Sequence, residues 1–455
     1  MNLPNYFLAD LPKEAALTPV LVSEACATLR RNRSSYLAEH STASMVKLLG
    51  ELAAEWLDPE FPFRKLLMEQ APEKLGYSAG TLARGLDQFF RRVTADSLRH
   101  LVEQDLGHPA RLDRVSASPA EEKTGRASLA VAPEFLVHIA AGNLPPPALQ
   151  SIILGLLVRS AQFVKCATGT SLVPRLFAHS LYQAHPKIGA CLEVVEWPGG
   201  SADLEEPLFA AADCITATGA DETLAAIRTR VPARARFLGY GHKVSFSFVA
   251  AAALSGGAAA RVAARAADDV AAWDQQGCLS PQVVYVETGG ALKPEAFAEL
   301  LAGELEAKEA TEPRGKIGVA EAATISSRRS FYEVRAAHSR ETRVWQSKGS
   351  TAWTVVYEAD PQFQASCLNR FVYVKGVKNL EQALHGAERI REKVSTVGLA
   401  APEEKEQELV RRLARWGARR ICPLGSMQDP PLVWRHDGRP SLGDLVSWTD
   451  WEMMV

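Results

Sequence analysis

The sequence lacks every cysteine pattern that a disulfide framework or a thiolate zinc site requires. Its seven cysteines are odd in number, and no two of them are spaced as CxxC. We therefore expect neither structural disulfides nor a bound metal ion. Isolated thiols persist in a reducing compartment, so the cysteine content predicts a cytoplasmic protein.

Long apolar runs and an excess of one charge are also missing. The longest apolar stretches, such as 144–158, are shorter than the roughly 20 residues that span a bilayer. The N-terminus, MNLPNYFLADLPKEA, has no basic segment followed by an apolar one, so we predict no signal peptide. Acidic and basic side chains number 53 and 51, which argues against nucleic acid as the main partner.

The chain does hold enough apolar residues for several cores, because 47% of its 455 residues are hydrophobic. We predict a helical N-terminal region over 1–110, packed on a cofactor-binding α/β domain over 111–250. An α/β catalytic domain over 251–424 and a C-terminal arm over 425–455 are predicted to follow. In the first region Val46, Leu49, Ala53, Trp56 and Leu57 share one helical face, and Ser78 is the predicted N-cap of a helical segment that runs to 106.

From about residue 127 short apolar runs alternate with helical segments. Strands are predicted over 128–132, 135–140, 162–166, 192–197, 214–217 and 236–238, with helices over 148–158, 172–184, 203–212 and 221–229 between them. This alternation is typical of βαβ units around a parallel sheet. The predicted fold class is therefore α/β, with ligands expected beyond the carboxyl ends of the strands.

A second α/β unit is predicted after the first. An alanine-rich helix over 258–273 leads into DQQGCLSPQ, and the later elements are strands over 283–286, 352–357 and 371–374 and helices over 294–308 and 380–394. The end of the chain is rich in proline and tryptophan and is predicted to pack as an arm.

Cys278 is the first candidate for chemistry. It follows Gly277 at the end of a helix and precedes a β-branched strand. A nucleophilic cysteine needs such a loop position with partial exposure. The alternative is a small buried hydrophobe, which is how we interpret the other six cysteines.

Several residues at strand ends are candidates for binding a cofactor or an oxyanion. The amide of Asn143 is suited to an oxyanion or to a turn. Lys165 lies at the end of one predicted strand and Thr168 follows it, while Thr218 and Gly219 stand at the end of another. Cations, hydroxyls and a helix N-terminus suit ribose and phosphate, although ordinary turns use the same residues.

No GxGxxG follows any strand, and Gly241 stands in a stretch, GYGHK, that is only partly similar to it. His138 and His242 are the histidines nearest these motifs. Each is suited either to acid–base chemistry or to a structural hydrogen bond.

The order of these segments resembles the aldehyde dehydrogenase superfamily, and most closely its LuxC-type branch of acyl-CoA reductases. The resemblance rests on HIAAGNLPPPALQSIILGLL, AAWDQQGCLSP, NRFVYVKGV with the later EKVSTVGLA, and the C-terminal WRHDGRPSLGDLVSWTD. It covers residues 125 to 450. It implies an aldehyde-dehydrogenase-like fold, in which a Rossmann-like cofactor domain stands beside an α/β catalytic domain.

The resemblance also implies roles for individual residues. Cys278 corresponds to the nucleophile that carries the acyl group as a thioester, and Asn143 to the oxyanion-hole amide. Lys165 corresponds to the lysine that holds the adenosine ribose. Thr168 stands where relatives that prefer NAD often have a glutamate, and a threonine leaves room for a 2′-phosphate, which implies NADPH as the cofactor.

Two further matches and two departures complete the comparison with the family pattern. Thr218 and Gly219 correspond to the turn near the pyrophosphate, and Gly241 joins them as a candidate cofactor contact. Hydrolytic aldehyde dehydrogenases have a glutamate base before a Gly-Gly pair, whereas 239–243 contains no carboxylate. The segment 366–370 also lacks the glutamate that usually helps to hold the nicotinamide ribose. The missing base favours an acyl-enzyme that accepts hydride rather than water.

The resemblance therefore implies NADPH-dependent reduction of a long-chain acyl-CoA to the aldehyde through an S-acyl intermediate on Cys278. Two alternatives stay open: an aldehyde dehydrogenase running toward the acid, and a non-catalytic acyl-carrying subunit. An acyl-protein synthetase is implied as a partner. The superfamily habit of exchanging C-terminal arms implies a homo-oligomer.

Overall fold

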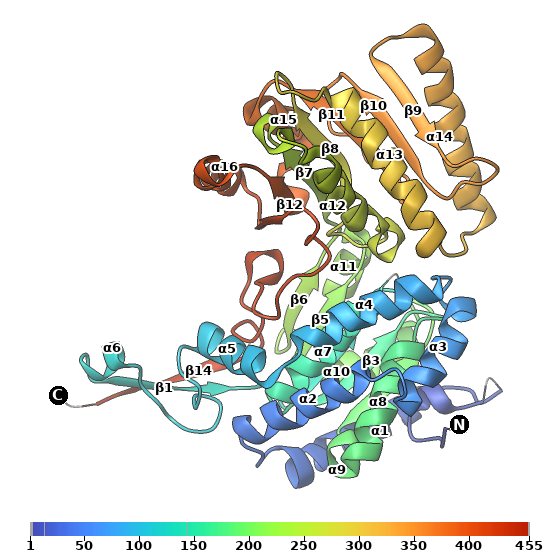
Figure 1. Cartoon of the computed structure of the whole chain (residues 1–455). Coiled ribbons are helices and arrows are strands. Elements are labelled where there is room, and N and C mark those ends of the chain that lie inside the picture. The colour runs from blue at the N-terminus through green and yellow to red at the C-terminus, as the bar shows by residue number, and fades with distance from the viewer. Residues whose placement is uncertain (1–2, 13, 143, 454–455) are drawn as a thin grey trace. The chain divides into compact units, whose positions relative to one another are not determined.

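The computed structural model describes residues 3–12, 14–142 and 144–453, and the chain divides into two compact units (Figure 1). The first unit comprises 1–70, 86–241 and 431–455, and the second comprises 71–85 and 242–430. No helix among the described residues is both long and apolar enough to cross a membrane.

The N-terminal region is helical, as predicted. Its main helices are α1 (Pro19–Asn32), α2 (Thr42–Leu57), α3 (Pro62–Lys74), α4 (Ala79–Arg92) and α5 (Ala95–Leu106). In α2 the predicted apolar face is buried except for half-buried Leu57, and the Trp56 indole donates a hydrogen bond to the Ser180 hydroxyl at 2.9 Å. Ser78 accepts a hydrogen bond from the N–H of Thr81, but the segment to 106 contains two helices because the Thr94 hydroxyl caps α5 by accepting from the N–H of Ser97.

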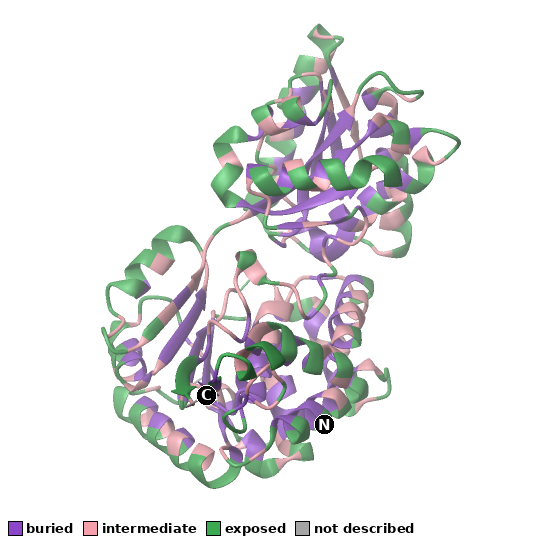
Figure 2. Cartoon of the chain, turned by 90° about the vertical axis from the view of Figure 1, so that its left-hand side faces the viewer, coloured by how far each residue is buried: buried purple, intermediate pink, exposed green. Residues whose placement is uncertain are grey.

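The first unit is built on a five-stranded sheet of order β4-β3-β2-β5-β6, and each of its neighbouring pairs is parallel. Its strands are β2 (Phe135–Ile139), β3 (Ala161–Cys166), β4 (Leu192–Glu196), β5 (Cys214–Thr218) and β6 (Arg236–Tyr240). The connecting helices are α7 (Pro145–Leu157), α8 (Leu172–Ala184), α9 (Pro186–Gly189), α10 (Ala202–Ala211) and α11 (Asp221–Arg228). The strands are mostly buried and the outer helix faces exposed (Figure 2), so the predicted βαβ arrangement is confirmed.

The second unit is built on a seven-stranded sheet of order β13-β12-β7-β8-β11-β10-β9, in which the pair of β9 with β10 is antiparallel and the others are parallel. Its strands are β7 (Val244–Val249), β8 (Pro281–Glu287), β9 (Thr342–Gln346), β10 (Thr354–Glu358), β11 (Phe371–Val377), β12 (Val394–Ala400) and β13 (Arg420–Pro423). Helices α12 (Ala259–Ala271) and α13 (Pro294–Thr311) share one apolar core with it. Helices α14 (Val319–His338), α15 (Leu380–Gly386) and α16 (Glu403–Trp416) share a second core.

Some of the elements predicted for this unit were wrong, and others were not predicted. The helix predicted over 380–394 ends at Gly386, and 394–400 forms the interior strand β12 instead. Strand β7 places residues 244–249 in the second sheet, so the units divide after Gly241 rather than at residue 250. Residues 71–85 also lie in the second unit, where the Tyr77 ring packs edge-on against Trp273 at 5.3 Å.

The end of the chain pairs with a strand near its first third. β14 (Ser447–Glu452) is antiparallel to β1 (Arg126–Val131), so β1 lies in a separate two-stranded sheet rather than in the parallel one. Residues 431–455 belong to the first unit, whereas Gly425 and Met427 donate their backbone N–H groups to Asp269 in the second. The segment predicted as one arm therefore has two parts.

Candidate active site

Cys278 lies in a turn of the second unit between the short 3-10 helix at Ala272–Gln275 and strand β8. Its side chain is exposed, although its neighbours Gly277 and Leu279 are buried. The chain thus presents one thiol at the surface on a turn whose backbone is packed on both sides. A nucleophile needs this combination of access and a fixed base.

The other six cysteines have a different environment. Burial raises the pKa of the thiols of Cys26, Cys166, Cys191, Cys214 and Cys422 to about 12. Cys367 is half-buried, and burial raises the pKa of its thiol as well. Because the thiolate is the reactive form, these six are poor nucleophiles near neutral pH. Among the seven cysteines, all of which the structure describes, Cys278 alone is exposed.

A polar frame fixes the backbone of the Cys278 turn. The Ser245 hydroxyl on β7 donates to the Cys278 carbonyl oxygen at 2.7 Å and accepts from the N–H of Thr396 on β12 at 3.1 Å. The Ser280 N–H closes the turn onto the Gly277 carbonyl at 3.0 Å. A Cβ on Gly277 would stand 2.5 Å from the Gln428 side-chain amide, so any larger residue there would displace that amide.

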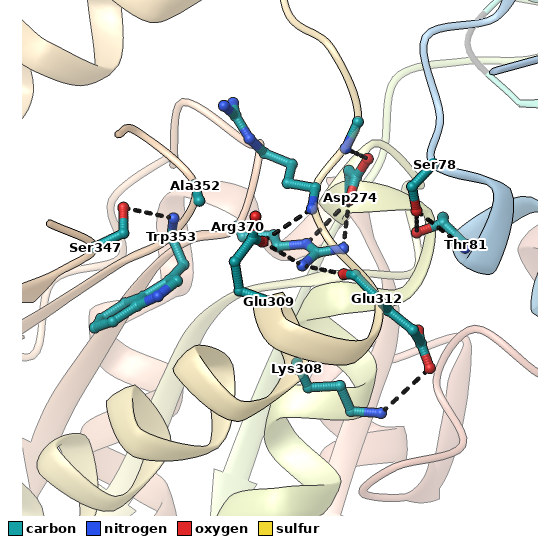
Figure 3. A network of polar contacts seen from close by, with 12 residues as sticks. Ser78, Thr81, Asp274, Lys308, Glu309, Glu312, Ser347, Ala352, Trp353 and Arg370 are labelled. Atoms are coloured by element: carbon teal, nitrogen blue, oxygen red, sulfur yellow. Dashed lines mark hydrogen bonds and ion pairs between the residues drawn. The ribbon is translucent and has the colours of Figure 1, made fainter. Parts of the chain in front are cut away.

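Two runs of strained backbone meet behind this turn. Trp273, Asp274 and Gln275 are left-handed, with φ of 53°, 50° and 64°, and so are the three residues of 368–370, with φ between 57° and 64°. A residue with a side chain pays about 1–3 kcal/mol for this conformation. Arg370, which is wholly buried, donates from Nε to Oδ1 of Asp274 at 2.9 Å (Figure 3).

In the first unit, Lys165 and Thr168 mark the carboxyl end of β3. Lys165 is buried, and burial lowers the pKa of its ammonium group. The negative charges of Glu205 and Glu196 raise that pKa, but by less. Thr168 is exposed in the turn that follows. The carboxylate of Glu196, at the end of β4, accepts from the backbone N–H of Gly169 at 2.5 Å and of Ser171 at 3.2 Å. An acidic group therefore holds this turn, although sequence reasoning expected none.

Thr218, Gly219 and Gly241 gather at the ends of β5 and β6. Thr218 pairs with Tyr240, whose carbonyl accepts from the Gly219 N–H at 3.2 Å. A Cβ on Gly241 would collide with Oδ1 of Asp221. The first turn of α11 carries two acids, Asp221 and Glu222, which oppose a phosphate at that helix end. The predicted neighbours are thus brought together, but the charge there is less favourable than expected.

Asn143 lies outside the described residues. Its neighbour Gly142 lies against the turn after β3, because a Cβ there would stand 3.1 Å from Thr170 and 3.2 Å from Ala167. His138 on β2 is fully enclosed between Thr216 at 2.7 Å and Gln162 at 2.9 Å, and burial lowers the pKa of its imidazole to about 4. A neutral histidine with a hydrogen-bond partner at each ring nitrogen fits the structural interpretation rather than the acid–base one.

The chain matches the family described as acyl-CoA reductase (LuxC) over residues 37–448. It belongs to this family. The long-chain acyl-protein thioester reductase of Aliivibrio fischeri is 26% identical over 420 residues, which cover 90% of this chain and 82% of that protein.

Solved structures confirm the aldehyde-dehydrogenase-like fold of this LuxC-family protein. Proline utilization A of Bradyrhizobium japonicum has a TM-score of 0.71 at 16% identity, over 96% of this chain but only 45% of that chain. An NAD-dependent benzaldehyde dehydrogenase from Corynebacterium glutamicum has a TM-score of 0.69 at 12% identity, over 98% and 94%. With the family match, these likenesses make the protein an oxidoreductase and confirm the resemblance inferred from the sequence.

Sequence reasoning missed several residues that frame the LuxC-family cysteine. Ser245, Asn369 and Gln428 lie 33, 91 and 150 positions away from Cys278 along the chain. Their contacts with the turn depend on the order of strands in the sheet, which no local pattern reveals. The polar Gln275–Gln276 pair was the one local signal. Its side chains bind the Pro281 carbonyl at 2.8 Å and Asn369 at 2.7 Å.

Proposed function

We propose that this LuxC-family protein reduces a long-chain acyl-CoA to the aldehyde with NADPH, through an acyl group held on Cys278. The observation that carries the proposal is the exposure of Cys278 on a rigid polar frame, while burial or half-burial covers the other six thiols. A family of acyl reductases needs one accessible thiol of this kind to hold an acyl group.

The chain's own groups account for the covalent steps. The Cys278 thiolate adds to the thioester carbonyl carbon, the bond to the CoA sulfur breaks, and CoA leaves. Asn143 and the backbone N–H of Cys278 are proposed as donors to the oxyanion. When bound, NADPH supplies the hydride that the acyl carbon receives. The bond between that carbon and the Cys278 sulfur then breaks, which releases the aldehyde, returns the thiolate and consumes one proton overall.

The absence of a carboxylate in 239–243 supports reduction over oxidation. His242 and Lys243 stand at the start of the second unit, and the Lys243 ammonium group donates to the Glu392 carbonyl at 3.1 Å. Neither side chain supplies the carboxylate base that hydrolysis of an acyl-enzyme requires. An acyl group on Cys278 therefore persists until its carbonyl carbon receives a hydride or the group is transferred to a thiol.

The carboxyl edge of the five-stranded sheet fits the adenosine half of a dinucleotide. Lys165 and Thr168 would hold the ribose, and Thr218, Gly219 and Gly241 would lie along the pyrophosphate. Both oxygens of Glu196 already accept backbone N–H groups, so this carboxylate is partly neutralised at the place where a 2′-phosphate must fit. The proposed cofactor is NADPH, and Glu196 is the group that would limit the preference for NADPH over NADH.

The acyl donor follows from thioester chemistry. The curated relatives are named acyl-protein thioester reductases, whereas the family name specifies acyl-CoA. Both donors present the same carbonyl to Cys278. We propose acyl-CoA as the donor, with an acyl-protein synthetase as a partner that delivers the acyl group when CoA does not. Because this chemistry needs a reduced thiol, the cytoplasmic location remains part of the proposal.

Self-association is the remaining part of the proposal. Every residue of β14 is exposed, including Trp448 at 43% and Trp451 at 56%, and the outer edge of β14 pairs with no other strand of the described residues. Exposed tryptophans on an open edge favour a protein partner, and a second copy of the chain offers the same edge. Light scattering of the wild type and of Trp451→Ser tests the proposed self-association. We expect the oligomer to be lost in the variant, and a monomeric wild type would contradict the proposal.

The deciding experiment measures NADPH oxidation with acyl-CoAs of graded chain length in the wild type and in Cys278→Ala. We expect acyl-CoA-dependent turnover in the wild type, none in Cys278→Ala, and near-normal turnover in the control Cys367→Ala. Mass spectrometry without NADPH should show the acyl group on Cys278. Turnover that survives in Cys278→Ala refutes the proposal, and aldehyde-dependent NADPH formation without CoA supports the oxidative alternative. Stable acylation without NADPH oxidation supports the acyl-carrying alternative.

A further inference from the structure

The two left-handed runs of the second unit are joined by an ion pair, and a second contact comes from Gln276, the residue that follows the first run. Arg370 pairs with Asp274, with its Nε at 2.9 Å and a terminal nitrogen at 2.8 Å from Oδ1. The Gln276 amide nitrogen donates to Oδ1 of Asn369 at 2.7 Å. We call these four residues the brace. Its first segment, 274–276, ends two residues before Cys278.

The brace is anchored to the helical layer of the second unit. Arg370 also donates to the Glu309 carboxylate at 3.1 Å and to the Glu312 carbonyl at 2.9 Å. The second oxygen of Asp274 accepts from the Gly315 N–H at 3.0 Å. Figure 3 shows Arg370 among these partners. Strained backbone persists only where its surroundings over-determine it, and these contacts do so on both sides of the pair.

A buried ion pair alone does not account for this arrangement. Arg159 in the first unit is also left-handed, with φ of 61°, and buried, and it pairs with Asp113 and with the carbonyls of His40 and Leu112. That pair anchors a single strained residue and leads to no reactive group. The brace instead couples two runs of three strained residues, and one of these runs leads to the exposed thiol.

We infer that Asp274, Gln276, Asn369 and Arg370 are positioning residues that hold Cys278 in the orientation required for attack on a thioester. The inference rests on the proposed role of Cys278. Orientation within the bound complex accounts for large rate factors, and a misplacement of about 1 Å costs on the order of a hundredfold. None of the four touches the reacting atoms in this role, since each acts through the backbone of the turn.

Asn369→Gly is the most direct test. Glycine accepts φ near 57° without strain, which offsets part of the stability lost with the buried side chain, so the variant should still fold, while the acceptor of Gln276 is lost. We expect acylation of Cys278 by an acyl-CoA to slow by about tenfold or more. Alkylation by iodoacetamide, which needs no fixed orientation, should slow much less. Equal rates of acylation in the variant and the wild type would overturn the inference.

The ion pair is tested by Asp274→Asn against a matched control, Asp113→Asn. Both substitutions remove one charge from a left-handed arginine's partner, so both should lower the melting temperature. Only Asp274→Asn should slow acylation relative to alkylation. An equal slowing in the two variants means that general destabilisation is responsible, and the positioning role is then wrong. If Asp274→Asn does not fold, Asn369→Gly decides alone.

The outcome is separable from that of the proposed function. Cys278→Ala run in parallel reports whether the thiol is the nucleophile. If activity disappears in Cys278→Ala while Asn369→Gly and Asp274→Asn acylate at the wild-type rate, the nucleophile stands and the brace fails. If Cys278→Ala remains active, the proposed function itself fails, whatever the brace variants do.

Discussion

The Ser245 hydroxyl donates a hydrogen bond to the carbonyl oxygen of Cys278 at 2.7 Å. Ser245 is fully buried on β7, and its oxygen also accepts from the N–H of Thr396 on β12, so one side chain joins the cysteine turn to two neighbouring strands. Ser245→Ala leaves both partners unsatisfied. We expect unfolding to become easier by about 1–3 kcal/mol and acylation of Cys278 to slow about tenfold.

Chemical denaturation and single-turnover acylation measure the two effects of Ser245→Ala. Ser247→Ala is the control, because Ser247 is equally buried on the same strand but its hydroxyl bonds the Met427 sulfur at 3.3 Å instead of the cysteine turn. Acylation should be near normal in that variant. Similar slowing in both would show that the Ser245 contact has no specific effect.

Gly277→Ala should disturb the cysteine turn through Gln428. The new Cβ would lie 2.5 Å from the Gln428 amide nitrogen, which donates to the Ser280 hydroxyl. Gln428 must move, at a cost of about 1–3 kcal/mol, and NADPH oxidation should fall with it. The double variant Gly277→Ala with Gln428→Ala should recover much of the loss.

Gly303→Ala is the matched control for Gly277→Ala. Gly303 lies in α13, and a Cβ added there would meet no atom within 4 Å, so alanine should stabilise the helix by about 0.5–1 kcal/mol. Thermal melting distinguishes the two variants. A wild-type melting temperature and rate for Gly277→Ala would contradict the close approach to Gln428.

Glu196→Gln should shift the cofactor preference toward NADPH. The carboxylate bonds the turn after Lys165, and it would repel a 2′-phosphate bound in the proposed place. The repulsion between one partly exposed carboxylate and a nearby phosphate weakens binding by about 1 kcal/mol. Without it, the ratio of kcat/KM for NADPH over NADH should rise roughly fivefold. Glu206→Gln, on an exposed face of α10, should leave the ratio unchanged. An unchanged ratio in both variants would place the 2′-phosphate elsewhere.

His138 should make the protein less stable in acid. Burial lowers the pKa of His138 from 6.5 to about 4, so the folded state resists a proton that the unfolded chain accepts. Its contribution to the free energy of unfolding is complete above pH 6.5. This contribution, about 3 kcal/mol in total, is lost as the pH falls toward 4. Denaturation curves of His138→Gln should show less of this acid sensitivity, while acylation at neutral pH should persist. A loss of acylation would instead indicate acid–base chemistry.

The sequence predicted the first unit better than the second because local patterns describe it well. Four of the five strands of that sheet, β2 to β5, are short apolar runs followed by a helix before the next strand, as at 161–166 and 172–184. The second sheet draws β7, β12 and β13 from distant parts of the chain. Residues 394–400 follow a helical pattern without a break in hydrophobicity, so only their pairing with β7 and β13 defines the strand.

The candidate site shows the same division. Residue type and a place at or beside the end of a strand were the grounds for predicting Cys278, Lys165, Thr168, Thr218 and Gly219. Glu196 was missed because its role depends on folding back onto the turn of a neighbouring strand. Asn369 and Arg370 were missed because left-handed backbone in residues other than glycine leaves no mark in the sequence.

The pairing of β1 with β14 joins Arg126 to Glu452 and Val131 to Ser447. A ribosome therefore releases β1 long before its partner strand exists, and all of the second unit except residues 71–85 is made in the interval. During that time the edge of β1 that later pairs with β14 is open, and an open strand edge is the feature that chaperones and misassembled copies recognise. The order of synthesis thus allows most of the unit that carries Cys278 to fold first, and the sheet of β1 and β14 in the first unit forms only after residues 447–452 are made.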